Sequence, residues 1–208
     1  FLPQSTPKIP GYEFFAYYHA AYEVGGDYYD FVPLKEDRLA IALGDVSGKG
    51  VAAALMMAKF SGDTRFLILS HDDPSKAAEA LNEQLCSAGI EEKFITLSLG
   101  ILDAARNSFT IVSAGHMPLI VRRASGEVEL VGDDVAGFSL GVMDDSRYRS
   151  TEIHLAPGDV VIVHSDGVTD SRNTAEELYD SKETPRLIER IRRQAAYEAL
   201  NLLRLATR

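Results

Sequence analysis

The feature that most constrains the fold is an apolar strand that ends at an aspartate and leads through a glycine turn into a helix. Residues 39–44 have the apolar composition of a strand, and Asp45 follows them directly. The next turn contains Gly48 and Gly50, and the apolar run 51–58 has the composition of a helix. Such an arrangement holds an acidic side chain rigidly at the mouth of a sheet.

Two further aspartates follow similar signals. The apolar run 160–163 leads to Asp166, which precedes a glycine, and Asp27 follows a pair of glycines. Taken singly, Asp45 and Asp166 are typical of a helix N-cap or a turn. Three carboxylates in one place would repel one another unless cations neutralised them, and hard oxygen ligands suit Mg²⁺ or Mn²⁺. We therefore expect the three aspartates to converge on divalent ions, where a metal-bound water is the attacking group for a phosphate ester.

Composition narrows the functional classes. At 208 residues the chain forms one domain or at most two small ones, which bury enough surface to be stable without added cross-links. The single cysteine, Cys86, excludes an internal disulfide framework, suits a reducing compartment and lies in a predicted helix, where a packing role is expected. A formal net charge of −10 argues against nucleic acid as the main partner. Because no apolar run approaches the roughly 20 residues that span a bilayer, we expect a cytoplasmic protein with no membrane segment here.

The remaining pattern predicts an α+β protein with largely antiparallel sheets. Residues 1–11 contain three prolines and predict an extended lead-in, the stub of a linker, before a domain over residues 12–208. Strands are expected at 13–18, 27–33, 39–44, 94–102, 108–113, 119–123, 128–131 and 148–155, with a last one that ends at Asp166. Helices are expected at 73–89, from 182 onward, and at 51–70, where the packing face would consist of Met56, Met57, Phe60 and Phe66.

Two other motifs fit this sequence incompletely. Residues 44–50 resemble a P-loop, but their glycine spacing is one residue short and Gly50 stands where Ser or Thr should hold Mg²⁺. Residues 166–170 resemble the aspartyl-phosphate loop of haloacid-dehalogenase hydrolases, but His164 stands where that loop needs an aspartate. A nucleotide site and a phospho-aspartate mechanism are therefore minor hypotheses.

Several polar residues are open to more than one interpretation. His116, in a Gly-His-Met-Pro loop, could orient a substrate or a metal-bound water, or make a structural hydrogen bond to backbone. Lys49 could attract a phosphate or be a solvated turn lysine. His164, Ser165 and Asp166 are consecutive on a predicted strand, so their side chains would alternate between faces and would not form a catalytic triad.

Four segments occur in the order found in one enzyme family. They are Val-Gly-Gly-Asp-Tyr-Tyr-Asp-Phe at 24–31, Gly-Asp-Val-Ser-Gly-Lys-Gly at 44–50, Ala-Gly-His-Met-Pro at 114–118 and Ser-Asp-Gly-Val-Thr-Asp at 165–170. With them, residues 1–173 resemble the SpoIIE/RsbU branch of the metal-dependent PPM phosphatases, bacterial relatives of protein phosphatase 2C. The resemblance implies a four-layer αββα sandwich, in which two antiparallel sheets are flanked by helices.

The resemblance also implies an activity and partners. Enzymes of this branch use Mn²⁺ or Mg²⁺ to remove phosphate from phosphoserine or phosphothreonine in proteins. Their usual substrate is a phosphorylated anti-sigma-factor antagonist, which is a STAS-domain protein. The other expected partners are a second copy of the chain, in a homodimer, and an upstream sensor domain in a longer chain, for which the start without methionine is a further indication.

Carried over residue by residue, the resemblance implies a centre of two ions. Asp45 would bridge both ions, and the carbonyl of Val46 would bind one of them. Asp27 and Asp166 would each complete the shell of one ion. Asp170 matches a position that binds a third ion in some relatives. These residues would act on the substrate through metal-bound water.

One element of the family pattern is missing. The family normally ends with a strand that carries a further metal-binding aspartate in an Asp-Asp-x-Thr motif, whereas residues 182–208 are basic and leucine-rich and lack it. The alternative function is therefore a non-catalytic signalling or interaction module with the PPM fold and an incomplete metal site. A third candidate is a metal-dependent hydrolase that acts on small phosphoesters.

Overall fold

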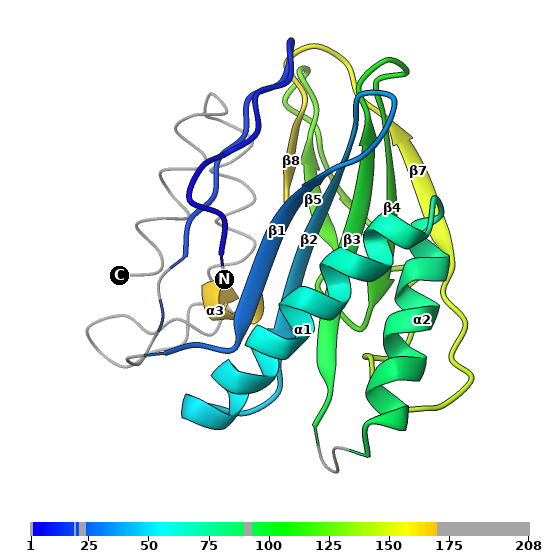
Figure 1. Ribbon diagram of the computed structural model, residues 1–208. Coiled ribbons are helices and arrows are strands. Elements are labelled where there is room, and N and C mark those ends of the chain that lie inside the picture. Colours follow the sequence, from blue (N-terminus) through cyan, green and yellow to red (C-terminus); the bar gives the residue numbers. More distant parts are fainter. Residues whose placement is uncertain (1, 19, 21–23, 90–92, 170–208) are drawn as a thin grey trace.

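The computed structural model describes residues 2–18, 20, 24–89 and 93–169 (Figure 1). Strands β1 (Asp27–Pro33) and β2 (Arg38–Val46) lead into helices α1 (Gly50–Ser70) and α2 (Pro74–Ser87). The elements that follow are β3 (Ile95–Asp103), β4 (Ser108–Ala114), β5 (Leu119–Arg122), β6 (Val128–Val131), β7 (Ser150–His154), β8 (Val160–Ile162) and the short α3 (Asp166–Thr169). Asp170 and the helix predicted from residue 182 lie outside the described residues.

The strands form two antiparallel sheets. The first has the order β1-β2-β3-β4-β7 and the second the order β6-β5-β8. Helices α1 and α2 cover the face of the first sheet that is turned away from the second (Figure 1). The predicted α+β class and its two antiparallel sheets are confirmed, and α1 and α2 form a helical layer on the outer face of the first sheet.

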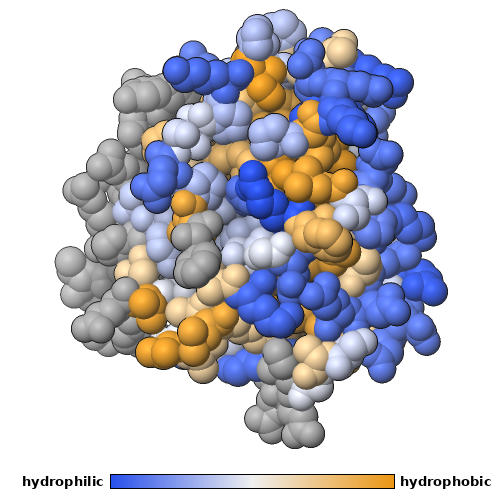
Figure 2. Space-filling view, viewed as in Figure 1, coloured by the Kyte–Doolittle hydropathy of each residue, from blue (hydrophilic) through white to orange (hydrophobic). Residues whose placement is uncertain are grey.

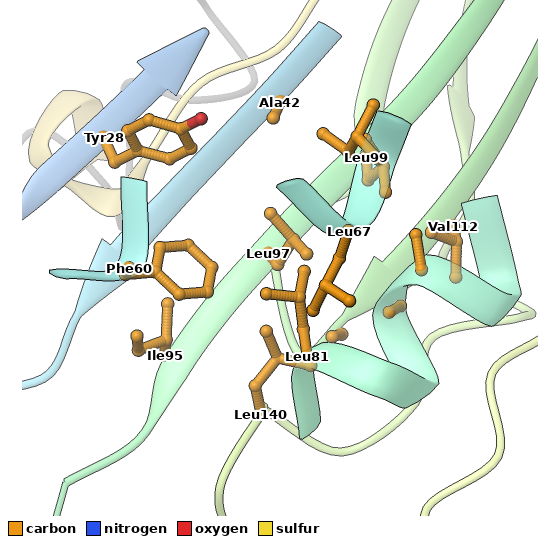
Figure 3. Close-up of a cluster of buried hydrophobic side chains, with 14 of the residues drawn as sticks. Tyr28, Ala42, Phe60, Leu67, Leu81, Ile95, Leu97, Leu99, Val112 and Leu140 are labelled. Atoms are coloured by element: carbon orange, nitrogen blue, oxygen red, sulfur yellow. The ribbon is translucent and has the colours of Figure 1, made fainter. Parts of the chain in front are cut away.

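Alternation along the strands divides the apolar core into two clusters. On the helix side, Phe60 of α1 and Leu81 of α2 pack with strand residues such as Leu97, and all three are at most 1% exposed (Figure 3). The Phe60 ring also meets Tyr28 edge to face, with 5.7 Å between ring centroids. The second cluster, which includes Leu39, lies between the sheets. Each fully buried side chain of this size contributes roughly 1.5–3 kcal/mol, so apolar packing on both faces holds the first sheet in place.

Helix α1 does not use the whole packing face that was predicted. Phe60 is buried, and Met56 and Met57 pack partly against the core, but Phe66 is 68% exposed. The prediction for Phe66 was wrong because residues i, i+4, i+7 and i+8 share one side of a helix, and position 66 is not among them when counted from Phe60. The residues that share the side of Phe60 are Thr64, Leu67 and Ile68.

The outer side of α1 is more apolar than that of an ordinary surface helix. The large hydrophobic side chains there are 59–68% exposed, and they are Val51, Leu55, Phe66 and Leu69. Figure 2 shows hydrophobic residues that reach the surface on the face that carries the helices. Even so, no helix among the described residues is long and apolar enough to cross a membrane.

The aromatic segment at residues 13–18 was predicted to be a strand and is not one. Within residues 2–18 the lead-in forms an isolated bridge between Ile9 and Tyr12. Phe14 packs its ring against Phe31 of β1, with 5.9 Å between ring centroids, and joins the cluster between the sheets. The aromatic composition of this segment therefore reflects packing against the sandwich and not period-two alternation along a strand.

Gly100 allows the core between the sheets to close over an aromatic ring. It lies in β3 opposite Ile111 of β4, and a Cβ at this position would overlap the ring of Phe109, which is 3% exposed. Because protein interiors are close-packed, the ring has little room to move away.

We expect Gly100→Ala to lower the free energy of unfolding by about 1–3 kcal/mol, because it overpacks the core. The matched control is Gly62→Ala in α1, where an added Cβ meets nothing within 4 Å. That change should raise stability by roughly 0.5–1 kcal/mol through helix propensity. Urea unfolding measures both variants, and effects of the same sign and size would contradict the packing assigned to Gly100.

Candidate metal centre

A row of three side chains crosses one end of the first sheet. Asp27 of β1 lies opposite Asp45 of β2, and Asp45 lies opposite Thr96 of β3. Residues that lie directly opposite each other in antiparallel strands share one face of the sheet. On β2 this is the face of Leu39, which belongs to the cluster between the sheets. The two carboxylates therefore point toward the space between the sheets, where both are partly exposed.

Asp166 reaches the same place from the second sheet. Strand β8 was predicted to continue to Asp166 but ends at Ile162, and Asp166 begins the short helix α3. Figure 1 shows α3 beside the start of β1. The hydroxyl of Ser165 donates a hydrogen bond of 3.0 Å to Oδ2 of Asp27, which ties this segment to the first sheet. Residues 164–166 are therefore not on a strand, contrary to the prediction.

The three carboxyl groups interact through Asp45. Its pKa is raised from 3.8 to about 8, first by burial, then by the negative charges of Asp27 and Asp166, and also by hydrogen bonds with both. Among the described residues, no lysine, arginine or histidine forms an ion pair with Asp27 or Asp45. The structure therefore brings the three aspartates together, and a proton on Asp45 offsets part of their repulsion at neutral pH.

The donor set fits a hard divalent cation. Asp27, Asp45 and Asp166 offer carboxylate oxygens, and the carbonyl of Val46 follows Asp45 at the end of β2. Gly26 keeps this carbonyl accessible, because a Cβ on residue 26 would lie 3.0 Å from the Val46 oxygen and crowd it. Oxygen ligands of this kind are those that Mg²⁺ and Mn²⁺ prefer.

The carboxylates are not preformed around a single point. In the part of the chain that the structure describes, no group of three or more His, Cys, Asp or Glu side chains has the geometry to hold an ion, although Asp45 interacts with both other aspartates. The lack of a preformed ion site and the contacts of Asp45 are consistent with each other. In the metal-free protein the acids are joined by hydrogen bonds through the proton of Asp45, and their oxygens are not arranged around an ion. A cation would take the place of that proton.

The other residues singled out by sequence surround this centre or lie outside the description. Lys49 is exposed and precedes α1 as its N-cap residue, without a capping hydrogen bond from its side chain. His116 is 7% exposed and makes the structural hydrogen bond to backbone that one of its interpretations required, with Nε2 at 3.1 Å from the carbonyl oxygen of His164. Asp170, the candidate for a third ion, lies outside the described residues.

The sequence analysis did not predict the contacts of two residues near the centre. Ser165 was considered there only as a member of a triad, and its hydrogen bond to Asp27 was not foreseen. Lys93 had no signal in the sequence, since its Nζ donates to the carbonyl of Ser47 at 3.2 Å across 46 positions of the chain. The Lys93 ammonium also lies against Gly48, where a Cβ would collide with it. Contacts of this range are set by tertiary structure and leave no local pattern.

Replacing Asp45 by asparagine should stabilise the metal-free protein at pH 8. Because the pKa of Asp45 in the folded state, about 8, is above its usual value of 3.8, its contribution to stability is present below about pH 4 and is lost as the pH rises toward 8. After allowance for partial exposure to solvent, the gain for Asp45→Asn at pH 8 should be on the order of 1 kcal/mol. Urea unfolding in EDTA between pH 4 and 8 measures it.

Asp133→Asn is the control for the change in net charge, because Asp133 is exposed. It should follow the pH profile of the wild type. Parallel profiles for the wild type and Asp45→Asn would contradict the raised pKa of Asp45.

The comparisons with known sequences agree on one family. Residues 35–207 match the model of the family described as Stage II sporulation protein E (SpoIIE). Phosphoserine phosphatase RsbU of Bacillus subtilis is 33% identical over 152 residues, which is 73% of this chain and 45% of RsbU. Protein IcfG of Synechocystis sp. is 29% identical over 86% of this chain and 32% of IcfG. The chain thus spans less than half of the length of these relatives.

Solved structures share the fold. The crystal structure of the RsbU and RsbW domains of Rv1364c from Mycobacterium tuberculosis has a TM-score of 0.71 at 26% identity, over 88% of this chain and 49% of that one. The PP2C phosphatase domain of SpoIIE from Bacillus subtilis, solved with a fragment of its regulatory domain, has a TM-score of 0.74 at 21% identity, over 91% of this chain and 55% of that one. The chain therefore belongs to the SpoIIE family and has the fold of PP2C-type phosphatase domains.

Proposed function

We propose that this chain is a Mn²⁺- or Mg²⁺-dependent protein phosphatase that acts on phosphoserine or phosphothreonine. The observation that carries the proposal is the meeting of Asp27, Asp45 and Asp166 at one end of the sandwich. A set of carboxylates this close is unfavourable without a cation, and bound divalent ions would neutralise it. The relatives named phosphoserine phosphatase, RsbU and RsbP of Bacillus subtilis, support the substrate class.

The proposed ligands have distinct positions around the centre. Asp45 would hold both ions, and Asp27 and Asp166 would each complete the shell of one. The carbonyl of Val46 would bind one ion, and Asp170 is the proposed ligand of a third. Bound divalent ions supply positive charge for the phosphoryl group and lower the pKa of water. Asp45 has to release its proton on binding, because the ionised carboxylate is the ligand.

The surroundings of the centre suit a phosphate group carried by another protein. Asp166, Gly167 and Lys49 are exposed, so the centre opens directly to solvent. The first turn of α1 has no acidic residue and no side-chain cap, and Lys49 adds a positive charge beside it. A helix N-terminus of this kind favours the approach of an anion. An open centre accommodates a phosphorylated segment on the surface of a folded partner.

The partners and boundaries of the domain follow from the same proposal. The phosphatase domain would cover residues 12–208, after the lead-in at 1–11. The substrate would be a phosphorylated STAS-domain antagonist of an anti-sigma factor, which places the reaction in the cytoplasm. An upstream sensor domain would control the activity, and a homodimer is the proposed assembly. The partial coverage of the curated relatives supports a longer chain.

A non-catalytic module with the same fold is the second candidate. The observation that favours it is the lack of an Asp-Asp-x-Thr motif in residues 182–208, which lie outside the described part of the structure. Without that aspartate one metal site would be incomplete. Calorimetric titration with Mn²⁺ separates the candidates, because the module would not bind the ion at millimolar concentration.

We expect Mn²⁺ to stimulate hydrolysis of p-nitrophenyl phosphate and of a phosphoserine peptide, and EDTA to abolish it. Asp45→Ala should lower kcat by about 100-fold or more, because charge stabilisation by metal ions is worth several kcal/mol and about 1.4 kcal/mol is tenfold in rate. Asp133→Ala, at an exposed position, is the control and should retain activity. Binding of the ion without any stimulated hydrolysis would contradict the enzymatic proposal. A preference for a nucleotide over the peptide would indicate instead a hydrolase of small phosphoesters.

A further inference from the structure

A chain of contacts leads from the aspartate row of the first sheet to the end of the second. Thr96 lies opposite Asp45 in the strand register, and its hydroxyl oxygen is 2.7 Å from Nδ1 of His116. Nε2 of His116 is 3.1 Å from the carbonyl oxygen of His164, in the segment that follows β8. His116 therefore connects β3 with the segment that carries the third aspartate.

Ser165 closes this chain of contacts into a ring. It directly follows His164, and its hydroxyl donates to Oδ2 of Asp27 at 3.0 Å. Asp27 lies opposite Asp45, where the chain of contacts began. In the sequence, Asp166 directly follows Ser165. The segment that carries Asp166 is thus tied to the first sheet on both sides, at β1 through Ser165 and at β3 through His116.

The partners of His116 determine its tautomer. Burial lowers the pKa of His116 to about 4, and the charge of His164 acts in the same direction, so the imidazole of His116 is neutral at physiological pH. A carbonyl oxygen only accepts, so Nε2 of His116 carries the hydrogen and donates it to His164. Nδ1 then has no hydrogen and accepts from the hydroxyl of Thr96. The two hydrogen bonds of His116 therefore each have one direction. Thr96 donates to His116, and His116 donates to the carbonyl of His164.

We propose that His116 and Ser165 are positioning residues that hold Asp166 within reach of Asp45. His116 acts through the carbonyl of His164, and Ser165 acts through the carboxylate of Asp27. The inference rests on the proposed function, because it gives both residues a part in the affinity for divalent ions.

The segment needs such support because it works against repulsion. Strand β8 has three residues and pairs with β5 only over positions 160–162, so in the described structure residues 163–165 follow without a strand partner. Asp166 nevertheless lies close enough to Asp45 for their charges to interact. Buried, directional hydrogen bonds from neighbouring groups orient metal ligands, and their loss typically lowers metal affinity about 10–100-fold.

Matched substitutions separate this role from simple packing. The amide nitrogen of Gln reaches the place of Nε2 and can donate to His164, whereas that of Asn reaches only the place of Nδ1. By calorimetry, His116→Asn and Ser165→Ala should lower Mn²⁺ affinity about 10–100-fold, and His116→Gln should stay within about threefold of the wild type. Ser98→Ala is the control, because Ser98 carries a buried hydroxyl on β3 that has no hydrogen-bond partner in the described structure. It should bind Mn²⁺ as the wild type does.

Hydrogen exchange tests the contacts in the metal-free protein. Amides of residues 163–166 should exchange about tenfold faster or more in His116→Asn than in the wild type, and His116→Gln should restore slow exchange. If His116→Asn does not fold, Ser165→Ala, at a half-buried position, takes its place in this test and should also exchange faster than the wild type.

The outcomes separate the two proposals. Exchange unchanged in Ser165→Ala and His116→Asn, or equal losses of affinity in His116→Asn and His116→Gln, would overturn the positioning role. Faster exchange in the variants together with a wild type that binds no Mn²⁺ would leave that role standing and reject the phosphatase function.

Discussion

Repulsion among three carboxyl groups is the constraint on which the rest of the structure depends. The register of β1 and β2 places Asp27 opposite Asp45, and Asp166 arrives from the other sheet. Burial and the nearby charges of Asp27 and Asp166 both disfavour ionisation, and they raise the pKa of Asp45 to about 8. The fold tolerates the set because apolar packing on both faces of the first sheet fixes the strands that carry it.

The two apolar clusters contribute differently to this centre. The cluster under the helices holds β1 and β2 through side chains such as Phe60, and so fixes two of the aspartates. The cluster between the sheets contains side chains of both sheets, and Gly100 of β3 leaves room in it for the Phe109 ring of β4. Val161 of β8 and Val163 pack against this cluster. The core between the sheets therefore holds the segment that precedes Asp166.

How much of this could be predicted depends on the range of the interactions involved. The strands near 27–33 and 39–46 follow from local composition, and the glycines beside the aspartates indicated that the acids converge. The hydrogen bond from His116 to a carbonyl 48 positions away leaves no local pattern, although the residue itself was noticed. Residues 13–18 misled because aromatic side chains suit strands and edge packing alike. Phe66 misled because both sides of α1 are apolar, so composition alone does not say which side meets the core.

The proton on Asp45 connects the metal-free structure with the proposed chemistry. The same carboxylate that shares this proton is the proposed ligand of both ions, so protons and cations compete for it. Low pH favours the hydrogen-bonded acids, and a pH near 8 favours the ionised set that binds cations. His116 stays neutral down to about pH 4, so above that pH its Nδ1 remains an acceptor for the hydroxyl of Thr96. A change of pH between about 4 and 8 therefore alters the charge of Asp45 without protonating His116.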